Sequence, residues 1–219
     1  ANVLESLRVC NHPCIAIIIT SDKAYDNVEQ IWGYKENDAM GGKDVYSGSK
    51  GAAELIIKSF FNSYFKLDQS KVRLCVARAG NVIGGGDWAK DRIIVDAISA
   101  WSKGESVEIR SPNATRPWQH VLEPLSGYLS LGEQLFLDKA LTGEGFNFGP
   151  AAEQNRTVYE LLNESSKYWK IDHEKAIIIS DNIPFHEAGL LKLNCDKALS
   201  ILKWKATLEY YDTVRFTNE

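Results

Sequence analysis

CIAIIIT, at residues 14–20, decides the fold predicted for this 219-residue chain. The run is continuously apolar, rich in β-branched residues and too short for a typical helix, so it predicts a strand buried on both faces. Further along, VYSGSKGAAELIIKSFFNSYFK (45–66) has apolar residues at helical spacing, and VRLCVA (72–77) is a second short apolar run. Strand, helix, strand is the unit of a doubly wound parallel α/β sheet, whose ligands bind beyond the carboxyl ends of the strands.

The rest of the sequence predicts shorter elements of mixed type. We expect helices at 2–8, 93–101, 124–137 and 158–169, and strands at 107–109, 146–148 and 177–179. Such elements indicate a second, smaller lobe packed on the sheet.

The glycine pattern of a dinucleotide-binding domain is missing from its usual place. No G-x-G-x-x-G follows the first predicted strand, and Gly84, Gly85 and Gly86 come only after the second strand, leading into Asp87 and Trp88. With a predicted helix already at residue 2, the sequence is typical of a chain that begins within a fold. We expect roughly 100 residues to be lacking, three βαβ units at about 30 residues each.

Composition and charge exclude several function classes. The 25 Lys and Arg residues against 29 Asp and Glu residues give a net charge of −4, so we expect no nucleic-acid partner. No apolar run approaches the ~18 residues of a membrane span, and no secretory signal opens the chain, so we expect a cytoplasmic protein without membrane contact. Its four scattered cysteines predict reduced thiols and no metal site.

Tyr46 and Lys50 open the long predicted helix. A spacing of four places both side chains on one helical face, where an ammonium favours the phenolate form of a tyrosine. Tyr46 is the only tyrosine of the sequence with a lysine four residues on, and Ser21 comes from the end of the preceding strand. The three residues therefore predict a site in which Tyr46 acts as a base.

Five segments together resemble the extended short-chain dehydrogenase/reductase family, and more closely its nucleotide-sugar 4,6-dehydratases. The matching segments are TSDKAY (20–25), VYSGSK (45–50), RAGNVIGGGDW (78–88), RPWQHVLEPLSGYL (116–129) and HEAGLLKLNCDKA (186–198). The resemblance implies a Rossmann-type fold, tightly bound NAD, CDP-glucose as substrate and a homodimer or homotetramer. It also implies a lyase of deoxysugar biosynthesis, of the kind that supplies lipopolysaccharide O-antigens.

The resemblance also implies a division of the chain. Residues 1–84 are expected to form the C-terminal half of the NAD-binding domain, with the catalytic tyrosine and lysine. Residues 85–219 are expected to form mainly the nucleotide-sugar-binding lobe, with 116–150 returning to the first domain.

Catalytic roles follow from the chemistry of water loss from a hexose. Oxidation at C4 acidifies the C5 hydrogen, so a base must take that proton while an acid protonates the C6 hydroxyl. The resemblance assigns C4 oxidation to Tyr46 with Lys50 and Ser21. Asp22 is then the acid that protonates the C6 hydroxyl. Lys23 is the C5 base, at a position where the family usually has Glu. Alternatively, the two residues have only a structural role, in which Asp22 caps the following turn and Lys23 is solvated. The residues expected to contact the cofactor are Thr20, Tyr46, Lys50 and Arg78.

Polar and aromatic residues after the second strand are candidates for the nucleotide-sugar pocket. Arginine offers a planar fork that grips a diphosphate through two parallel hydrogen bonds. Trp88 or Trp118 can stack on the pyrimidine, although a packing role is equally common. The expected substrate-binding residues are Asn81, Asp87, Trp88, Arg92, Arg116 and His120.

Other functions remain open at this stage. A nucleotide-sugar 4-epimerase needs the tyrosine and the lysine but no acid and base at positions 22 and 23. A dehydratase acting on a dTDP- or GDP-sugar shares all the catalytic residues. A truncated, catalytically silent assembly partner is the alternative outside enzymes, because the glycine-rich half has no counterpart in this sequence.

Overall fold

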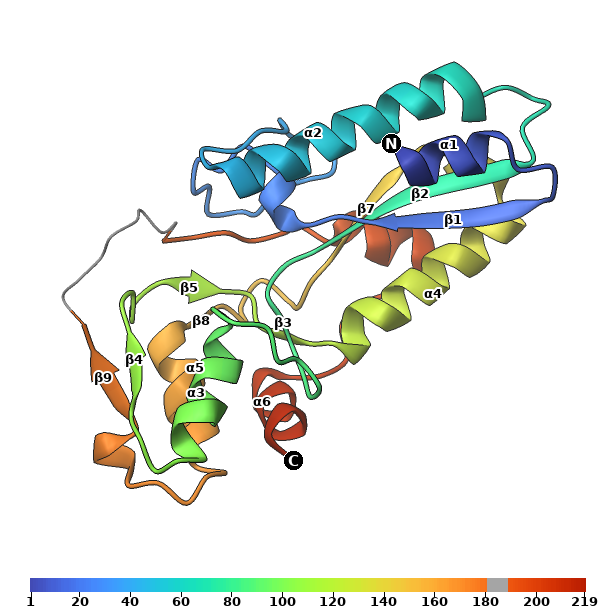
Figure 1. Ribbon diagram of the computed structural model, residues 1–219. Helices are drawn as coiled ribbons and strands as arrows, with labels where there is room; N and C mark the ends of the chain where they lie inside the picture. The colour runs from blue at the N-terminus through green and yellow to red at the C-terminus, as the bar shows by residue number, and fades with distance from the viewer. Residues whose placement is uncertain (181–188) are drawn as a thin grey trace.

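A three-stranded parallel sheet forms the centre of the molecule, in a computed structural model that describes residues 1–180 and 189–219 (Figure 1). Its order is β1-β2-β7, with bounds β1 Cys14–Ile19, β2 Val72–Ala79 and β7 Gly145–Phe148. Cys14 pairs with Val72, and the parallel register continues to Ile19 and Ala77. The predicted strand, helix, strand unit is therefore confirmed, with helix α2 (Val45–Phe60) between the two strands.

Helices cover both faces of the sheet. Helices α1 (Asn2–Arg8) and α2 lie on one face, and α4 (Leu122–Leu137) lies on the other (Figure 1). Along β2, Leu74 and Val76 pack toward α1 and α2, whereas Cys75 and Ala77 pack toward α4. Because alternate side chains of β2 enter two different cores, the strand is apolar from Leu74 to Ala77, as expected for a parallel sheet.

The first strand differs from its prediction. Cys14 to Ile18 are only half-buried, and Ile19 is 58% exposed, so the expectation of a strand buried on both faces is wrong for β1. Among the described residues β1 pairs only with β2, which leaves it at the edge of the sheet. An edge strand has one neighbour fewer to cover its side chains.

A second lobe contains the remaining helices and strands around its own core, which includes Trp101, Leu161, Leu162 and Val214. Its helices are α3 Ile93–Trp101, α5 Val158–Ser166 and α6 Tyr210–Asn218. Its strands form pairs: β3 Val82–Ile83 with β6 Gln119–His120, β4 Val107–Ile109 with β9 Ile177–Ile179, and β5 Thr115–Arg116 with β8 Arg156–Thr157. Across the whole chain, short 3-10 turns are η1 Asp22–Ala24, η3 Lys139–Leu141 and η4 His173–Lys175, and short π-helical turns are η2 Phe61–Phe65 and η5 Ala198–Leu202.

Capping residues place the carboxyl end of β1 beside the start of α2. Ser21 caps the turn η1, its Oγ accepting from the backbone N–H of Lys23 at 3.2 Å. Asp44 caps α2 by accepting from the backbone N–H of Ser47 at 2.9 Å. Turn η1 packs against α2, and a Cβ on Gly51 would lie 2.8 Å from the carbonyl oxygen of Gly41, so only glycine allows this approach. Within the described ranges, no helix has the length and hydrophobicity needed to cross a membrane.

Candidate active site

Asp22 is the most deeply buried acid at the end of β1, with 3% of its surface exposed. Its Oδ1 accepts a hydrogen bond from Ser21 Oγ at 3.0 Å. Its Oδ2 is buried and has no hydrogen-bond partner within residues 1–180 and 189–219. A Cβ on Gly80 would lie 2.7 Å from this oxygen, so the carboxyl group fits directly against the chain that leaves β2.

This burial changes the acidity of Asp22. Loss of hydration raises the pKa of its carboxyl group above the usual range. The positive charges of Lys23 and Arg116 and the hydrogen bond from Ser21 oppose the rise without cancelling it. The site therefore holds a carboxyl group that keeps its proton more readily than an ordinary aspartate and can donate it.

Tyr46 and Lys50 lie on one face at the first turns of α2, as their spacing predicts. The ammonium of Lys50 is 5.2 Å from the centre of the Tyr46 ring, and the phenol is 55% exposed. Hydrogen bonds from Ser47 lower the pKa of the Asp44 carboxyl, and the charge of Lys23 lowers it further, so the Lys23 side chain lies near the start of α2. The end of β1 and the start of α2 thus bring Asp22, Lys23 and the tyrosine pair to one end of the sheet.

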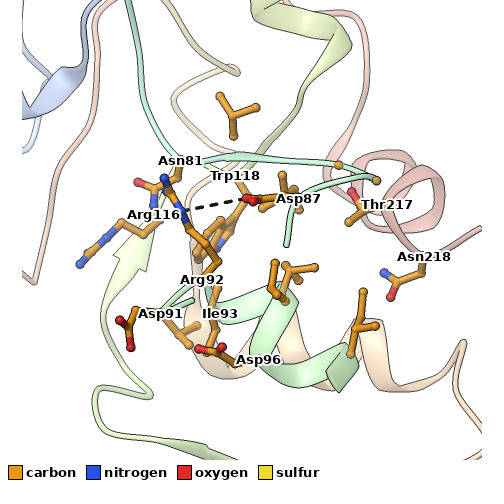
Figure 2. A pocket seen from close by; sticks show the side chains of 18 of the residues that line it. Asn81, Asp87, Asp91, Arg92, Ile93, Asp96, Arg116, Trp118, Thr217 and Asn218 are labelled. Atoms are coloured by element: carbon orange, nitrogen blue, oxygen red, sulfur yellow. Dashed lines mark ion pairs between the residues drawn. The ribbon is translucent and has the colours of Figure 1, made fainter. Parts of the chain in front are cut away.

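A cavity of about 510 Å³ lies next to this cluster, in the second lobe (Figure 2). Its walls come from the segment between β3 and α3, from α3, from the ends of β4 and β5, and from the end of α6. Five of the six predicted substrate-binding residues line it: Asn81, Asp87, Trp88, Arg92 and Arg116. A volume of this size is typical of small-molecule sites.

Two arginines occupy different positions in the cavity wall. The exposed Arg92 precedes α3, with its Nε 4.0 Å from Asp87 Oδ2 (Figure 2). Arg116 is only 3% exposed, and its Nη1 donates to the carbonyl oxygen of Thr115 at 2.8 Å. Because the charge of Arg116 also acts on the Asp22 carboxyl, this residue connects the cavity with the cluster at the end of β1.

The sixth predicted residue, His120, is not among the residues that line the cavity. Its side chain is buried, its Nδ1 accepts from the backbone N–H of Leu122 at 3.4 Å, and its ring centre is 6.0 Å from that of Phe216. Burial lowers the pKa of the imidazole, which favours its neutral form. These contacts give His120 a structural role.

The two tryptophans proposed for stacking also differ. Trp118 is buried in the core of the second lobe, and its indole N–H donates to the carbonyl oxygen of Arg156 at 3.1 Å. Trp88 is 76% exposed and lines the cavity, and Trp118 lines it from within that core, so both can contact a ligand.

Arg78 and Thr20, expected to contact a cofactor, bind the protein itself. The guanidinium of Arg78 is buried, donates to both carboxylate oxygens of Glu54 at 2.8 and 3.0 Å, and donates to Tyr25 Oη at 2.8 Å. Thr20 donates to the same Glu54. Arg78 thus forms an internal ion pair that ties β2 to α2, and Thr20 takes part in the same network. The cofactor contacts expected of both residues stay predictions.

Sequence reasoning missed several residues of the cavity wall. Asp96 and Arg110 line it, as do Thr217, Asn218 and Glu219 at the end of α6. Arg110 could have been found, because it directly follows a predicted strand, and polar residues directly after a strand were what identified the site at the end of β1. Helix α6 was not predicted at all. His186, in the last of the five matching segments, lies outside the described residues.

Comparisons with known proteins place this arrangement among enzymes of nucleotide sugars. No family model matches the sequence. The chain is 46% identical over 206 residues to the CDP-glucose 4,6-dehydratase of Salmonella typhimurium, a match that covers 93% of this chain. The chain spans 57% of that relative's length.

Solved structures share the fold at low sequence identity. A dTDP-glucose 4,6-dehydratase from Streptomyces venezuelae, solved with NAD bound, has a TM-score of 0.81 at 14% identity and matches 99% of this chain and 62% of its own. The UDP-glucuronic acid 4-epimerase of Bacillus cereus has a TM-score of 0.81 at 15% identity, over 99% of this chain and 63% of its own. The Rossmann-type α/β fold is therefore confirmed.

Proposed function

We propose that this chain belongs to the extended short-chain dehydrogenase/reductase family, beside the CDP-glucose 4,6-dehydratase that it resembles, and that the whole protein catalyses the reaction of that relative. It is an NAD-dependent lyase that removes water from CDP-glucose and releases CDP-4-keto-6-deoxyglucose. We also propose that the protein acts in the cytoplasm, in deoxysugar biosynthesis, and that it forms a homodimer or a homotetramer. The structural neighbours include both dehydratases and epimerases, so the choice between the two reactions depends on the residues of the site.

Tyr46 and Lys50 fit the reacting end of a nicotinamide cofactor. Both side chains lie on the open face at the start of α2, where a phenol and an ammonium can face a ribose and a sugar hydroxyl together. NAD, when bound, accepts a hydride from the sugar C4 and later returns it to C6. In this arrangement Lys50 holds the ribose and stabilises the phenolate of Tyr46.

Tyr46 begins the reaction by taking the proton of the C4 hydroxyl, so that C4 becomes a ketone. Ser21, at the end of β1, orients the C4 oxygen. The ketone then acidifies the hydrogen on the neighbouring carbon, C5.

Lys23 and Asp22 divide the elimination. Lys23 takes the C5 proton while the C6–O bond breaks, and Asp22 gives its proton to the departing hydroxyl, which leaves as water. Lys23 then returns a proton to C5 as hydrogen is restored at C6. Tyr46 releases the proton that it took from the C4 hydroxyl and Asp22 recovers one from solvent, so the protein returns to its starting state.

The buried carboxyl group of Asp22 is the observation that carries this choice of reaction. A 4-epimerase only oxidises C4 and reduces it again, which requires Tyr46 and Lys50 but no acid for the C6 hydroxyl. Burial that raises the pKa of Asp22, with one oxygen left without a partner among the described residues, suits a group that must donate a proton.

Substrate binding is assigned to the cavity beside the cluster. Arg116 lies between Asp22 and the cavity, so it suits the diphosphate nearest the sugar, and Arg92 at the start of α3 suits the same diphosphate from the other side. The backbone N–H groups at the start of α3 add to the attraction for an anion.

Deuterium exchange separates the roles of the two residues. The full-length Asp22→Asn variant, given CDP-glucose in heavy water, should accumulate reduced cofactor, and the substrate recovered from it should carry deuterium at C5, because Lys23 still removes that proton. Lys23→Met should also accumulate reduced cofactor, but its recovered substrate should carry no deuterium. Asp26→Asn, with the same change of charge four residues away, should turn over normally. Deuterium at C5 in both variants would show that Lys23 is not the base.

A further inference from the structure

Asp96 and Arg110 stand together on the cavity wall, away from the cluster at the end of β1. Asp96 is on α3 and Arg110 directly follows β4, and both side chains are exposed to the cavity. Partial burial and the charge of Asp91 raise the pKa of the Asp96 carboxyl, and the charge of Arg110 opposes this rise, so Asp91 and Arg110 both lie near Asp96 on the cavity wall. Neither Asp96 nor Arg110 makes a hydrogen bond or an ion pair with another side chain in the part of the chain that the structure describes.

The order of groups along the cavity shows which part of a nucleotide sugar reaches them. Arg116 is next to Asp22, where the sugar reacts, and Arg92 precedes α3, so a diphosphate lies near these two arginines. Asp96 is four residues after Arg92, one helical turn further along α3. Figure 2 shows Asp96 near Asp91, beyond Arg92, and two carboxylates repel a phosphate. This end of the cavity therefore suits the nucleoside.

We propose that Arg110 and Asp96 recognise the base of the nucleotide sugar and select cytosine; this rests on the proposed function of the cavity. The edge of cytosine presents two acceptors, O2 and N3, followed by an amino donor on C4. Arginine can only donate and an ionised carboxylate can only accept, so Arg110 matches O2 and N3 while Asp96 matches the amino group.

In uracil and thymine, the donor or acceptor character is exchanged at two of these three positions. Their N3 carries a hydrogen and their C4 carries an oxygen. In the same position the N3–H would face the donors of Arg110, and O4 would face the carboxylate of Asp96. A site whose polar groups are left unpaired rejects such a ligand strongly, and a good bidentate contact alone is worth roughly five- to 150-fold in discrimination.

Binding of CDP and UDP to the full-length protein tests this directly, by calorimetry and without turnover. The unmodified protein should bind CDP at least tenfold more tightly than UDP. Asp96→Asn should reduce this ratio to about threefold or less, because an amide both donates and accepts, and Arg110→Gln should do the same. Both residues are exposed, so neither variant threatens the fold. Glu105→Gln removes one nearby negative charge outside the cavity wall and should keep the ratio.

Three results would overturn the inference. The first is equal binding of CDP and UDP by the unmodified protein. The second is an unchanged ratio in both cavity variants. The third is an equal loss for the two nucleotides, which would assign Asp96 to the ribose hydroxyls. The proposed function is judged separately, by whether CDP-glucose loses water, so equal nucleotide binding with normal turnover would refute the base recognition alone.

Discussion

At Asp22, the burial that suits a proton donor also lowers the stability of the protein when the carboxyl group is ionised. Its carboxyl group is buried beside Gly80, and one oxygen has no hydrogen-bond partner in the described ranges. An ionised carboxylate in such a place is costly, because it loses water without gaining an equivalent partner. The same burial raises the pKa and keeps the proton available for donation.

The Asp22→Asn variant should therefore gain stability relative to the unmodified protein, and the difference in unfolding free energy should grow as the pH rises. The folded-state pKa of Asp22 is above its unfolded value, so its contribution to stability is complete below the unfolded pKa and is lost as the pH rises through the folded pKa. Urea unfolding of the variant and the unmodified protein at pH 5 and pH 8 measures this, with Asp26→Asn as control. A difference in unfolding free energy that does not grow with pH would contradict the raised pKa.

Tyr46→Phe tests the first step of the proposed reaction. The phenol is 55% exposed, so removing its hydroxyl should change the unfolding free energy by no more than about 0.5 kcal/mol. CDP-glucose should still bind, while turnover falls roughly 10²- to 10⁴-fold because the base is lost. Calorimetry and product formation on the same preparation check both parts. Turnover within twofold of the unmodified protein would remove Tyr46 from the mechanism.

Local patterns in the sequence placed site residues better than they showed contacts between distant segments. Tyr46 and Lys50 share a helical face because of local spacing alone, and the end of an apolar strand locates Asp22. The ion pair of Arg78 was not predicted because its partner, Glu54, comes from a helix 24 residues earlier, and no local pattern shows that the two meet.

At the scale of elements, Glu123 connects α4 with the chain that leads into α6. Its buried Oε1 accepts from the backbone N–H groups of Thr207 and Leu208, at 2.9 and 2.6 Å. Helix α6 follows directly and contributes Thr217 and Asn218 to the cavity wall. A contact outside the cavity thus holds the helix that supplies one of its walls.

Glu123→Ala should lower the unfolding free energy by about 2 to 3 kcal/mol, because two backbone donors lose a charged acceptor. It should also weaken binding of CDP-glucose, since α6 is less firmly held. Glu133→Ala, an exposed glutamate on the same helix, should change stability by no more than about 0.5 kcal/mol. Denaturant unfolding of both variants checks this, and equal stabilities would show that Glu123 does not hold the segment.

Elements of three or more residues with an apolar pattern were predicted closely, and strands of two residues were not predicted. Helix α3 and strands β4 and β9 have the predicted bounds, 93–101, 107–109 and 177–179. Strands β3, β5, β6 and β8 have two residues each, too few for an apolar pattern, and they exist because distant segments meet. Helix α6 has polar residues throughout its sequence, YYDTVRFTN, which conceal its buried face.

At the scale of the whole molecule, the site is assembled from segments far apart in sequence. The end of β1, the start of α2 and the link after β2 form the cluster around Asp22, and the second lobe supplies the cavity. Arg116 stands between the two. In the proposed reaction the sheet positions the groups that transfer protons, and we propose that the less regular lobe selects the nucleotide.

The mass of the product from CDP-glucose tests the central claim most directly. The full-length protein, incubated with CDP-glucose and analysed by mass spectrometry, should convert it to a species lighter by one molecule of water that still carries CDP. An isomer of unchanged mass would identify a 4-epimerase instead, and would contradict the role of Asp22 as the acid of a dehydration.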